Sequence, residues 1–527
     1  MYRIAIDVGE TCSNFVAALQ QGVAAFVRVP SIAVEPISSI ASGLSSLAKE
    51  LQLTGEDLLN QTASIVVSPL VESKSLQRFL LDAGYQGEVL RMHCDGSVVN
   101  AMDCKKFEVN KISAGAAGGV VGAQIAARSA GAETLISFEM GETRTYLAVL
   151  AQGALPLTYN TTAPGEQTAS PVIEVLTLEV GANAAAYLDS GGILRVGPSH
   201  PSTDLSAVAG AQGGPTLTDA GIVLGFQNSS SLVIEAADEE RQTARERVGV
   251  LAAALGVGLE EAAQGMLQVV QTRIAEAIHL MAVRQGTDLK QSVLFAFGTA
   301  AGLHATAVAR ALAIKRVLFP LPAAVYSALG MSQSGLRHEV VNSVAASLTD
   351  EMEDELRARY LTMDGEAHQR MTQRFDGSIE VEFAADMHFS GQNAVIRVPF
   401  DAADLQAPGF IEHLERKFRQ CYAKRYTCNI ENEEVIVAKA RVAAIGKLPE
   451  PTEVLPLGMM EQELAKKRRV FLNGEWRELD LHGADQLASD QQLQGPALIA
   501  LPGARLLLGN NDRSRRTAWG VCDIDVR

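Results

Sequence analysis

Two short stretches of the chain carry the same arrangement of acidic, glycine and hydroxyl residues. The first reads Asp7-Val-Gly-Glu-Thr-Cys-Ser-Asn14, and the second reads Glu139-Met-Gly-Glu-Thr-Arg-Thr-Tyr146. In such a turn, glycine lets a ligand approach the backbone, hydroxyl groups donate hydrogen bonds, and the carboxylate holds Mg2+ through water. The repeat therefore predicts two facing loops that grip a phosphate chain and its metal.

Each stretch lies between two apolar runs, so each is expected to be the turn of a hairpin. Residues 3–6 and 15–19 flank the first stretch, and residues 134–138 and 147–150 flank the second. Short apolar runs separated by glycine and polar residues are typical of strand, tight turn and strand. A later segment, Leu294 to Ala305, has the form of a strand, a glycine-containing turn and a helix start, which suits a nucleotide-binding loop.

Composition limits the class of protein and its partners. The chain has 527 residues, which predicts two to four domains, and a net charge of −16, which argues against nucleic acid or an anionic membrane as a partner. Its six cysteines lack Cys-x-x-Cys spacing, so we expect free thiols and no metal site. Neither a signal peptide nor an apolar run of 18 residues is found, and we expect a cytoplasmic protein.

In this order, the motifs resemble the actin–hexokinase–Hsp70 class of ATPases, and within it the hydantoinase A/5-oxoprolinase/acetone carboxylase family. There the loops read Asp-x-Gly-Gly-Thr-x-Thr-Asp and Asp-Met-Gly-Gly-Thr-Ser-Thr-Asp. Further matches are a glycine-rich helix start at 113–123, the ending Asp189-Ser-Gly-Gly192, and Gly495-Pro-Ala-Leu-Ile499. The resemblance implies an α/β, two-lobed actin/hexokinase/Hsp70-like ATPase fold with a β-rich C-terminal region.

The resemblance and the change of hydrophobic period divide the chain into three parts. Residues 1–348 are expected to form the two-lobed ATPase domain, residues 349–446 an α+β connecting domain, and residues 447–527 a small C-terminal β domain. The last part begins with a proline-rich linker and carries an Asn-Gly hairpin signal at Asn473.

The resemblance also implies which residues hold a Mg-nucleotide, with the last two near the adenosine: Asp7, Gly9, Thr11, Ser13, Glu139, Gly141, Thr143, Thr145, Gly298 and Gly302. It assigns no catalytic residue and no separate metal site. Thr218 and Asp219 are further candidates, for which a helix N-cap is the alternative reading. For His304 we favour a capping or packing role over catalysis.

The chain departs from the family pattern where phosphates should lie. The second glycine of each loop is replaced by Glu10 and Glu142, the closing aspartates by Asn14 and Tyr146, and a family histidine by Leu176. About a hundred residues with a His-Gly-Thr-Thr segment have no counterpart. Because a carboxylate repels phosphate and a side chain blocks the backbone, we expect ATP and Mg2+ to bind weakly or not at all.

Two functions remain open. In the first, the chain is a subunit of an ATP-dependent hydantoinase/oxoprolinase-type amidohydrolase or ketone-carboxylase complex, with a degenerate nucleotide site and a structural or regulatory role. In the second, it is an active subunit that phosphorylates a carbonyl oxygen or bicarbonate to open a cyclic amide or carboxylate a ketone. A sugar kinase is a distant third. In either of the first two, we expect a hydantoinase B-like or carboxylase partner subunit.

Overall fold

A computed structural model describes most of the chain. The described residues are 1–19, 22–32, 34–68, 72–101, 113–160, 167–197, 214–226, 238–392, 395–426, 430, 433–448, 467–483, 487 and 492–527. The loop at 199–204 and most of the linker at 447–456 lie outside them.

The first lobe is built on a sheet whose strands run in the order β3-β2-β1-β4-β5. The first three strands are antiparallel neighbours, whereas β4 and β5 are parallel to β1. A core of aliphatic side chains joins the sheet to its helices, with Ile4, Ile6, Ile40 and Leu44 among its members. The elements are β1 (Tyr2–Val8), β2 (Cys12–Leu19), β3 (Gly22–Pro30), α1 (Pro36–Glu50), α2 (Gly55–Asn60), β4 (Thr62–Val67), α3 (Ser73–Asp82) and β5 (Glu88–Met92).

The second lobe repeats this topology, because its first five strands run in the order β11-β8-β7-β14-β15. Strand β7 is antiparallel to β8 and parallel to β14, as β1 is to β2 and β4. The duplicated hairpins thus head two equivalent sheets, and the predicted two-lobed fold is confirmed. The elements are β7 (Thr134–Met140), β8 (Thr145–Ala151), β11 (Leu176–Leu178), α6 (Leu217–Val223), α7 (Asp238–Leu255), α8 (Leu259–Gln285), β14 (Val293–Phe297), α9 (Ala305–Ala311) and β15 (Arg316–Pro320).

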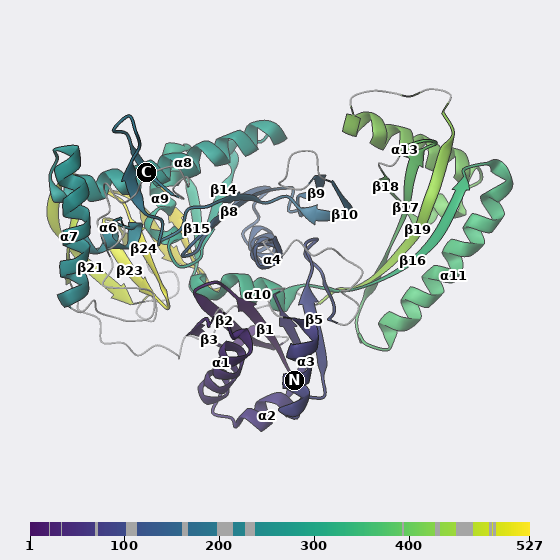
Figure 1. Cartoon of the computed structure of the whole chain (residues 1–527), viewed down its shortest axis with the longest axis horizontal. Coiled ribbons are helices and arrows are strands. Elements are labelled where there is room, and N and C mark those ends of the chain that lie inside the picture. The colour runs from purple at the N-terminus through teal and green to yellow at the C-terminus, as the bar shows by residue number, and fades with distance from the viewer. Residues whose placement is uncertain are drawn as a thin grey trace.

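Two helices cross between the lobes, α4 (Ser113–Ser129) and α10 (Tyr326–Gln333) (Figure 1). They touch at glycines: a Cβ added at Gly330 would lie 1.8 Å from the carbonyl oxygen of Gly118, and one at Gly122 would lie 2.7 Å from the Tyr326 ring. Only residues without a side chain allow two backbones to approach this closely. Helix packing therefore explains Gly118 and Gly122 of the glycine-rich run at 113–123.

The first sheet continues into an arm that projects from the body (Figure 1). Strands β18, β17, β19, β16 and β6 extend it to ten strands, with β16 starting inside the predicted first domain. Tyr360, Phe383, Phe400 and Phe410 form the aromatic core between this sheet and its helices. The elements are β6 (Val98–Asn100), β16 (Leu336–Ser347), α11 (Glu353–Thr372), β17 (Ile379–Phe389), β18 (Ile396–Phe400), α12 (Ala402–Gln406), α13 (Phe410–Tyr426) and β19 (Val435–Gly446).

The C-terminal strands divide between two sheets. Strands β20-β21-β23-β24 form a four-stranded sheet, whereas β26, β25 and β22 extend the sheet of the second lobe beyond β15. Both Asn473 and Gly474 have positive φ between β20 and β21, as a two-residue hairpin turn of this type requires. The strands are β20 (Lys467–Leu472), β21 (Glu475–Gly483), β22 (Gln492–Gln494), β23 (Ala497–Leu501), β24 (Ala504–Leu508), β25 (Arg513–Arg516) and β26 (Val521–Asp525).

The remaining strands are β9 (Leu157–Asn160), β10 (Gln167–Ile173), β12 (Ala186–Leu188) and β13 (Leu194–Val196). Among the described residues, no single helix is long and apolar enough to cross a membrane, although α7 and α8, bent by 88°, meet that test when taken together.

Candidate functional site

The two acidic residues that open the repeated motifs lie against one face of helix α4. A Cβ added at Gly115 would lie 3.0 Å from Oδ1 of Asp7, and one at Gly119 would lie 2.9 Å from Oε2 of Glu139. Positions four apart share a helix face. The ends of β1 and β7 thus bring both carboxyl groups together where the lobes meet, and we call this region, with turns 9–12 and 141–144, the lobe junction.

Burial controls the protonation of both groups. It raises the pKa of Asp7 to about 6, while the Ser68 hydroxyl acts in the opposite direction. It raises the pKa of Glu139 to about 8; the Ser327 hydroxyl, which donates to Oε1 at 2.6 Å, lowers this pKa, and the charge of Asp7 raises it. At neutral pH Glu139 is therefore mainly an uncharged acid.

The first turn closes through its own backbone. The Gly9 amide donates to the carbonyl oxygen of Cys12 at 3.0 Å, and the Thr11 side chain is exposed. Ser13 is fully buried, and its hydroxyl lies 2.8 Å from that of Ser31. Of the two predicted hydroxyl donors in this loop, only Thr11 is free to reach outward.

The second turn has the same form. The Gly141 amide donates to the carbonyl oxygen of Arg144 at 2.9 Å, and Thr143 is exposed. Thr145 is fully buried, and its hydroxyl donates to the carbonyl oxygen of Val180 at 2.6 Å. Thr145 therefore fixes the neighbouring segment.

That neighbouring segment contains one glycine, Gly181, directly after Val180. A Cβ added at Gly181 would lie 2.4 Å from the carbonyl carbon of Glu142. The amide of Ala182 donates to the carbonyl oxygen of Gly141, and that of Asn183 donates to the carbonyl oxygen of Glu142. Gly181 thus allows the segment to pack on the second turn.

The two other candidates of this region belong to helix α6. Thr216 is its N-cap and forms a capping box with Asp219, while the Thr218 hydroxyl donates to the carbonyl oxygen of Ala182 at 3.0 Å. Asp219 is therefore the N3 residue of a capping box, whereas the N-cap itself is Thr216 and not Thr218.

Each of the two extra glutamates forms an ion pair with an arginine of the opposite lobe. Glu10 Oε1 lies 2.6 Å from Arg144 Nη1, with 51% and 26% of the side chains exposed. Glu142 Oε1 lies 2.5 Å from Arg28 Nη2 on β3, with 14% and 10% exposed. We call the Glu10–Arg144 contact the outer pair and the Glu142–Arg28 contact the inner pair.

These arginines are the residues that the sequence reasoning missed. Arg144 occupies the position where the family loop reads Ser. Because the same loop also gains the negative charge of Glu142, the new positive charge of Arg144 could have indicated an ion pair. Arg28 belongs to no recognisable motif. Only the pairing of β3 with β2, in which Arg28 lies opposite Asn14, brings it to the lobe junction.

Tyr146 stands where the family loop closes with aspartate. Its pKa is raised to about 12, chiefly by burial and by the charge of Glu139, with the Arg144 guanidinium opposing both effects. Asn14 faces Asp7 in the β1–β2 pairing, and its buried Oδ1 has no hydrogen-bond partner within the described part of the chain. Asn14 and Tyr146 thus lie opposite the two acids on the paired strands, where the family loops close with aspartate.

The predicted adenosine-side turn is packed on both sides. Gly298 has a φ of +93°, and a Cβ there would lie 2.5 Å from the carbonyl oxygen of Met140. A Cβ at Gly302 would lie 2.2 Å from the carbonyl oxygen of Arg505 on β24. His304 is buried, its Nδ1 lies 3.4 Å from Gln271 Nε2, and burial lowers its pKa to about 4. Both glycines serve close backbone packing here, and their role toward a nucleotide stays a prediction.

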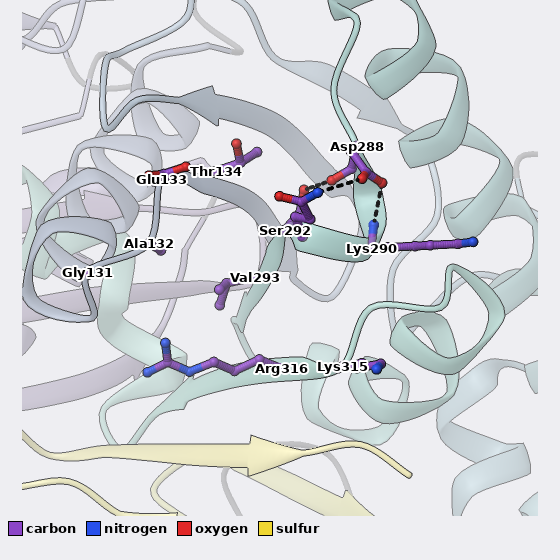
Figure 2. A pocket seen from close by; sticks show the side chains of 11 residues that line it. Gly131, Ala132, Glu133, Thr134, Asp288, Lys290, Ser292, Val293, Lys315 and Arg316 are labelled. Atoms are coloured by element: carbon purple, nitrogen blue, oxygen red, sulfur yellow. Dashed lines mark hydrogen bonds between the residues drawn. The ribbon is translucent and has the colours of Figure 1, made fainter.

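A surface pocket of about 460 Å³ lies elsewhere, at the beginnings of β7, β14 and β15 (Figure 2). Its lining includes Asp288, Lys290 and Arg316 but none of the predicted site residues. Because β7 and β14 start here and end beside Glu139 and Gly298, the pocket and the lobe junction lie at opposite ends of these two strands. Among the described residues, no three histidine, cysteine or acidic side chains are grouped to hold a metal ion.

Comparison with known families identifies two matching regions. A family model described as hydantoinase/oxoprolinase matches residues 66–340, and one described as hydantoinase/oxoprolinase C-terminal domain matches residues 345–521.

Similar proteins include three with named activities. The chain is 24% identical to caprolactamase subunit alpha of Pseudomonas jessenii, over 86% of this chain and 66% of that protein. It is 23% identical to 5-oxoprolinase 1 of Arabidopsis thaliana, over 89% and 38%, and 21% identical to the acetone carboxylase beta subunit of Xanthobacter autotrophicus, over 74% and 57%. The chain thus spans two thirds or less of the lengths of these three relatives.

Two solved structures share the fold over the whole chain. A nucleotide-free acetone carboxylase structure has a TM-score of 0.80 at 13% identity, and the ATP-dependent caprolactamase of Pseudomonas jessenii has a TM-score of 0.70 at 18% identity. Both alignments cover 100% of each chain.

Proposed function

Because the chain belongs to the hydantoinase/oxoprolinase family, we propose that it is a structural or regulatory subunit of an ATP-dependent amidohydrolase or ketone-carboxylase complex. Its lobe junction is held closed by its own side chains. In this proposal the chain keeps the family's scaffold and lacks a working nucleotide site.

The observation that carries the proposal is the pair of reciprocal ion pairs between the lobes. In an active member with these repeated hairpins, the two turns would hold a nucleotide's phosphates and metal from opposite sides. Here the bridging charges belong to Glu10, Arg144, Glu142 and Arg28. A nucleotide would have to break these ion pairs, and each freed carboxylate would cost a phosphate at roughly 4 Å about 1–4 kcal/mol, a sizeable part of the roughly 8 kcal/mol of micromolar binding.

The donors around the junction support the same proposal. The hydroxyls of Ser13 and Thr145 are buried in contacts with Ser31 and Val180. Gly302 packs on the backbone of β24. The residues of this chain therefore fit a Mg-nucleotide poorly, and we derive no reaction step through it.

An active nucleotide site is the alternative, and one observation favours it. Thr11 and Thr143 remain exposed beside the paired acids Asp7 and Glu139. If the half-exposed Glu10 turned outward, these hydroxyls would face a phosphate chain. The chain would then activate a carbonyl oxygen or bicarbonate by phosphoryl transfer, by positioning and charge neutralisation.

A partner subunit is part of the proposal. Two relatives are named as subunits, one of caprolactamase and one of acetone carboxylase. Among the described residues of this chain, the junction holds no acid, base and nucleophile arranged for ring opening or carboxylation. We therefore propose a hydantoinase B-like or carboxylase partner, which should copurify with the chain from its native source.

Titration calorimetry with Mg-ATP, on the chain alone and on the copurified complex, tests the proposal. We expect no binding in the micromolar range by the chain, and tighter binding by the double variant Glu10→Gly/Glu142→Gly. Glu366→Gln is the control, since Glu366 pairs with Arg370 on the arm helix α11. Micromolar binding by the unmodified chain would overturn the proposal in favour of the active subunit.

A further inference from the structure

The inner pair is incomplete on its arginine side. Arg28 Nη2 donates to Glu142, to which the Cys12 thiol also donates at 3.9 Å, but Arg28 Nε and Nη1 are buried and have no hydrogen-bond partner among the described residues. The Arg28 side chain is only 10% exposed. A guanidinium normally satisfies its donors with water or protein oxygens, so the element that covers Arg28 keeps water from these two nitrogens.

The cover includes the turn between β23 and β24 in the C-terminal sheet. A Cβ added at Gly503 in this turn would lie 3.4 Å from Arg28 Nη1 and 3.0 Å from the Cβ of Ala324. Gly503 has a φ of +65°, a conformation that favours glycine. Two independent constraints, backbone conformation and close contact, thus call for glycine where the turn meets Arg28.

The same hairpin is fixed to the second lobe along its length. The Thr306 hydroxyl on α9 donates to the carbonyl oxygen of Leu507 at 3.2 Å, and Gly302 packs on that of Arg505. The β23–β24 hairpin therefore contacts the adenosine-side turn, the turn at Ala324, and Arg28 of the first lobe. It is a third component of the lobe junction.

We infer that the β23–β24 turn regulates the closure of the lobes by covering the inner pair. While Gly503 lies on Arg28, no water competes with Glu142 for the guanidinium. When the turn lifts, Nε and Nη1 become hydrated and the attraction to Glu142 weakens, because an ion pair is weaker in water than in a buried site. Lifting of this turn therefore loosens the contact between the lobes.

This inference rests on the proposed function, in which the ion pairs replace a nucleotide. The two can nevertheless fail separately: tight Mg-ATP binding by the unmodified chain would refute the proposed function, whereas only a measurement of lobe closure refutes the coupling.

The test is hydrogen–deuterium exchange of the amides in turns 9–12 and 141–144, measured on the full chain. Gly503→Val should make these amides exchange at least about tenfold faster, since easier local opening raises exchange. Arg28→Gln defines the effect of losing the inner pair. The control is Gly474→Val, in the β20–β21 turn of the same sheet, where φ is +85° and no atom lies within 4 Å of an added Cβ.

Equal exchange in Gly503→Val and Gly474→Val would overturn the inference. If Gly503→Val does not fold, Gly503→Ala, which adds only the Cβ, replaces it against Gly474→Ala with the same two outcomes. A further requirement is that Gly503→Val adds little to Arg28→Gln, because both act through one pair. Full additivity would also count against the coupling.

Discussion

Arg144 Nη1 lies 2.6 Å from Glu10 Oε1, although the two residues are 134 positions apart and belong to the turns of different lobes. In the inner pair the lobes exchange roles: the second lobe supplies the glutamate, Glu142, and the first lobe supplies the arginine, Arg28. Each glutamate that replaces a family glycine is thus neutralised by an arginine from across the lobe junction. The two glutamates and the two arginines should therefore be tested together, each glutamate with its own arginine.

The outer pair should stabilise the chain only slightly. Glu10→Gln or Arg144→Gln is expected to lower the free energy of unfolding by about 0.2–1 kcal/mol, because both side chains are partly exposed. The exchanged variant Glu10→Arg/Arg144→Glu should recover most of this loss. Urea denaturation at low salt measures it, and salt near 0.5 M should remove most of the difference. No recovery on exchange would show that the pair itself contributes nothing.

The inner pair should matter far more when one partner is removed. Arg28→Met removes the arginine that pairs with the partly buried Glu142 carboxylate and is expected to cost up to about 3–5 kcal/mol. The double variant Arg28→Met/Glu142→Leu should cost less than Arg28→Met alone, since no uncompensated charge remains. Denaturant titration of the single and double variants gives the coupling free energy. Additive losses would contradict a direct interaction.

Stability should fall as pH rises through the range set by Glu139. Its pKa is raised from 4.5 to about 8, so between these values the folded chain binds more protons than the unfolded chain. Glu139→Gln keeps a side-chain oxygen that accepts the Ser327 hydrogen bond but cannot titrate. It should therefore reduce the change in the free energy of unfolding between pH 5 and 8 by on the order of a few kcal/mol.

The charged and titratable groups that face Glu139 also affect how stability depends on pH. Asp7, whose pKa is raised to about 6, adds a smaller change of the same sign, while Arg144 opposes the rise in the Tyr146 pKa. Thermal unfolding of the chain and of Glu139→Gln across this pH range checks the prediction. Parallel curves for the two proteins would contradict it.

Gly330 should tolerate no side chain. An added Cβ would lie 1.8 Å from the carbonyl oxygen of Gly118, so Gly330→Ala forces α4 and α10 apart and should cost about 1–3 kcal/mol or more. Gly365→Ala is the matched control in helix α11, where an added Cβ meets no atom within 4 Å. That variant should instead gain about 0.5–1 kcal/mol from helix propensity. Similar stability for both variants would refute close packing at the crossing.

Much of the fold was readable from local patterns. The repeated Gly-Glu-Thr turns and their apolar flanks predicted two hairpins, and the structure has them as β1–β2 and β7–β8. The Asn473-Gly474 turn was readable for the same reason: its conformation depends on residues adjacent in sequence. These features follow from the period of the side chains and from backbone sterics, which act over a few residues.

The electrostatics of the lobe junction were decided only by tertiary structure. From the sequence, Glu10 and Glu142 were unpaired charges in the path of phosphates. The folded chain places Arg144 and Arg28 beside them, and it turns the hydroxyls of Ser13 and Thr145 away from the junction. Similarly, the last strand β26 joins the second lobe's sheet beside β15, which no local pattern predicts. Charge pairing and strand order depend on distances between segments far apart in sequence, and those distances exist only once both lobes have packed on α4 and α10.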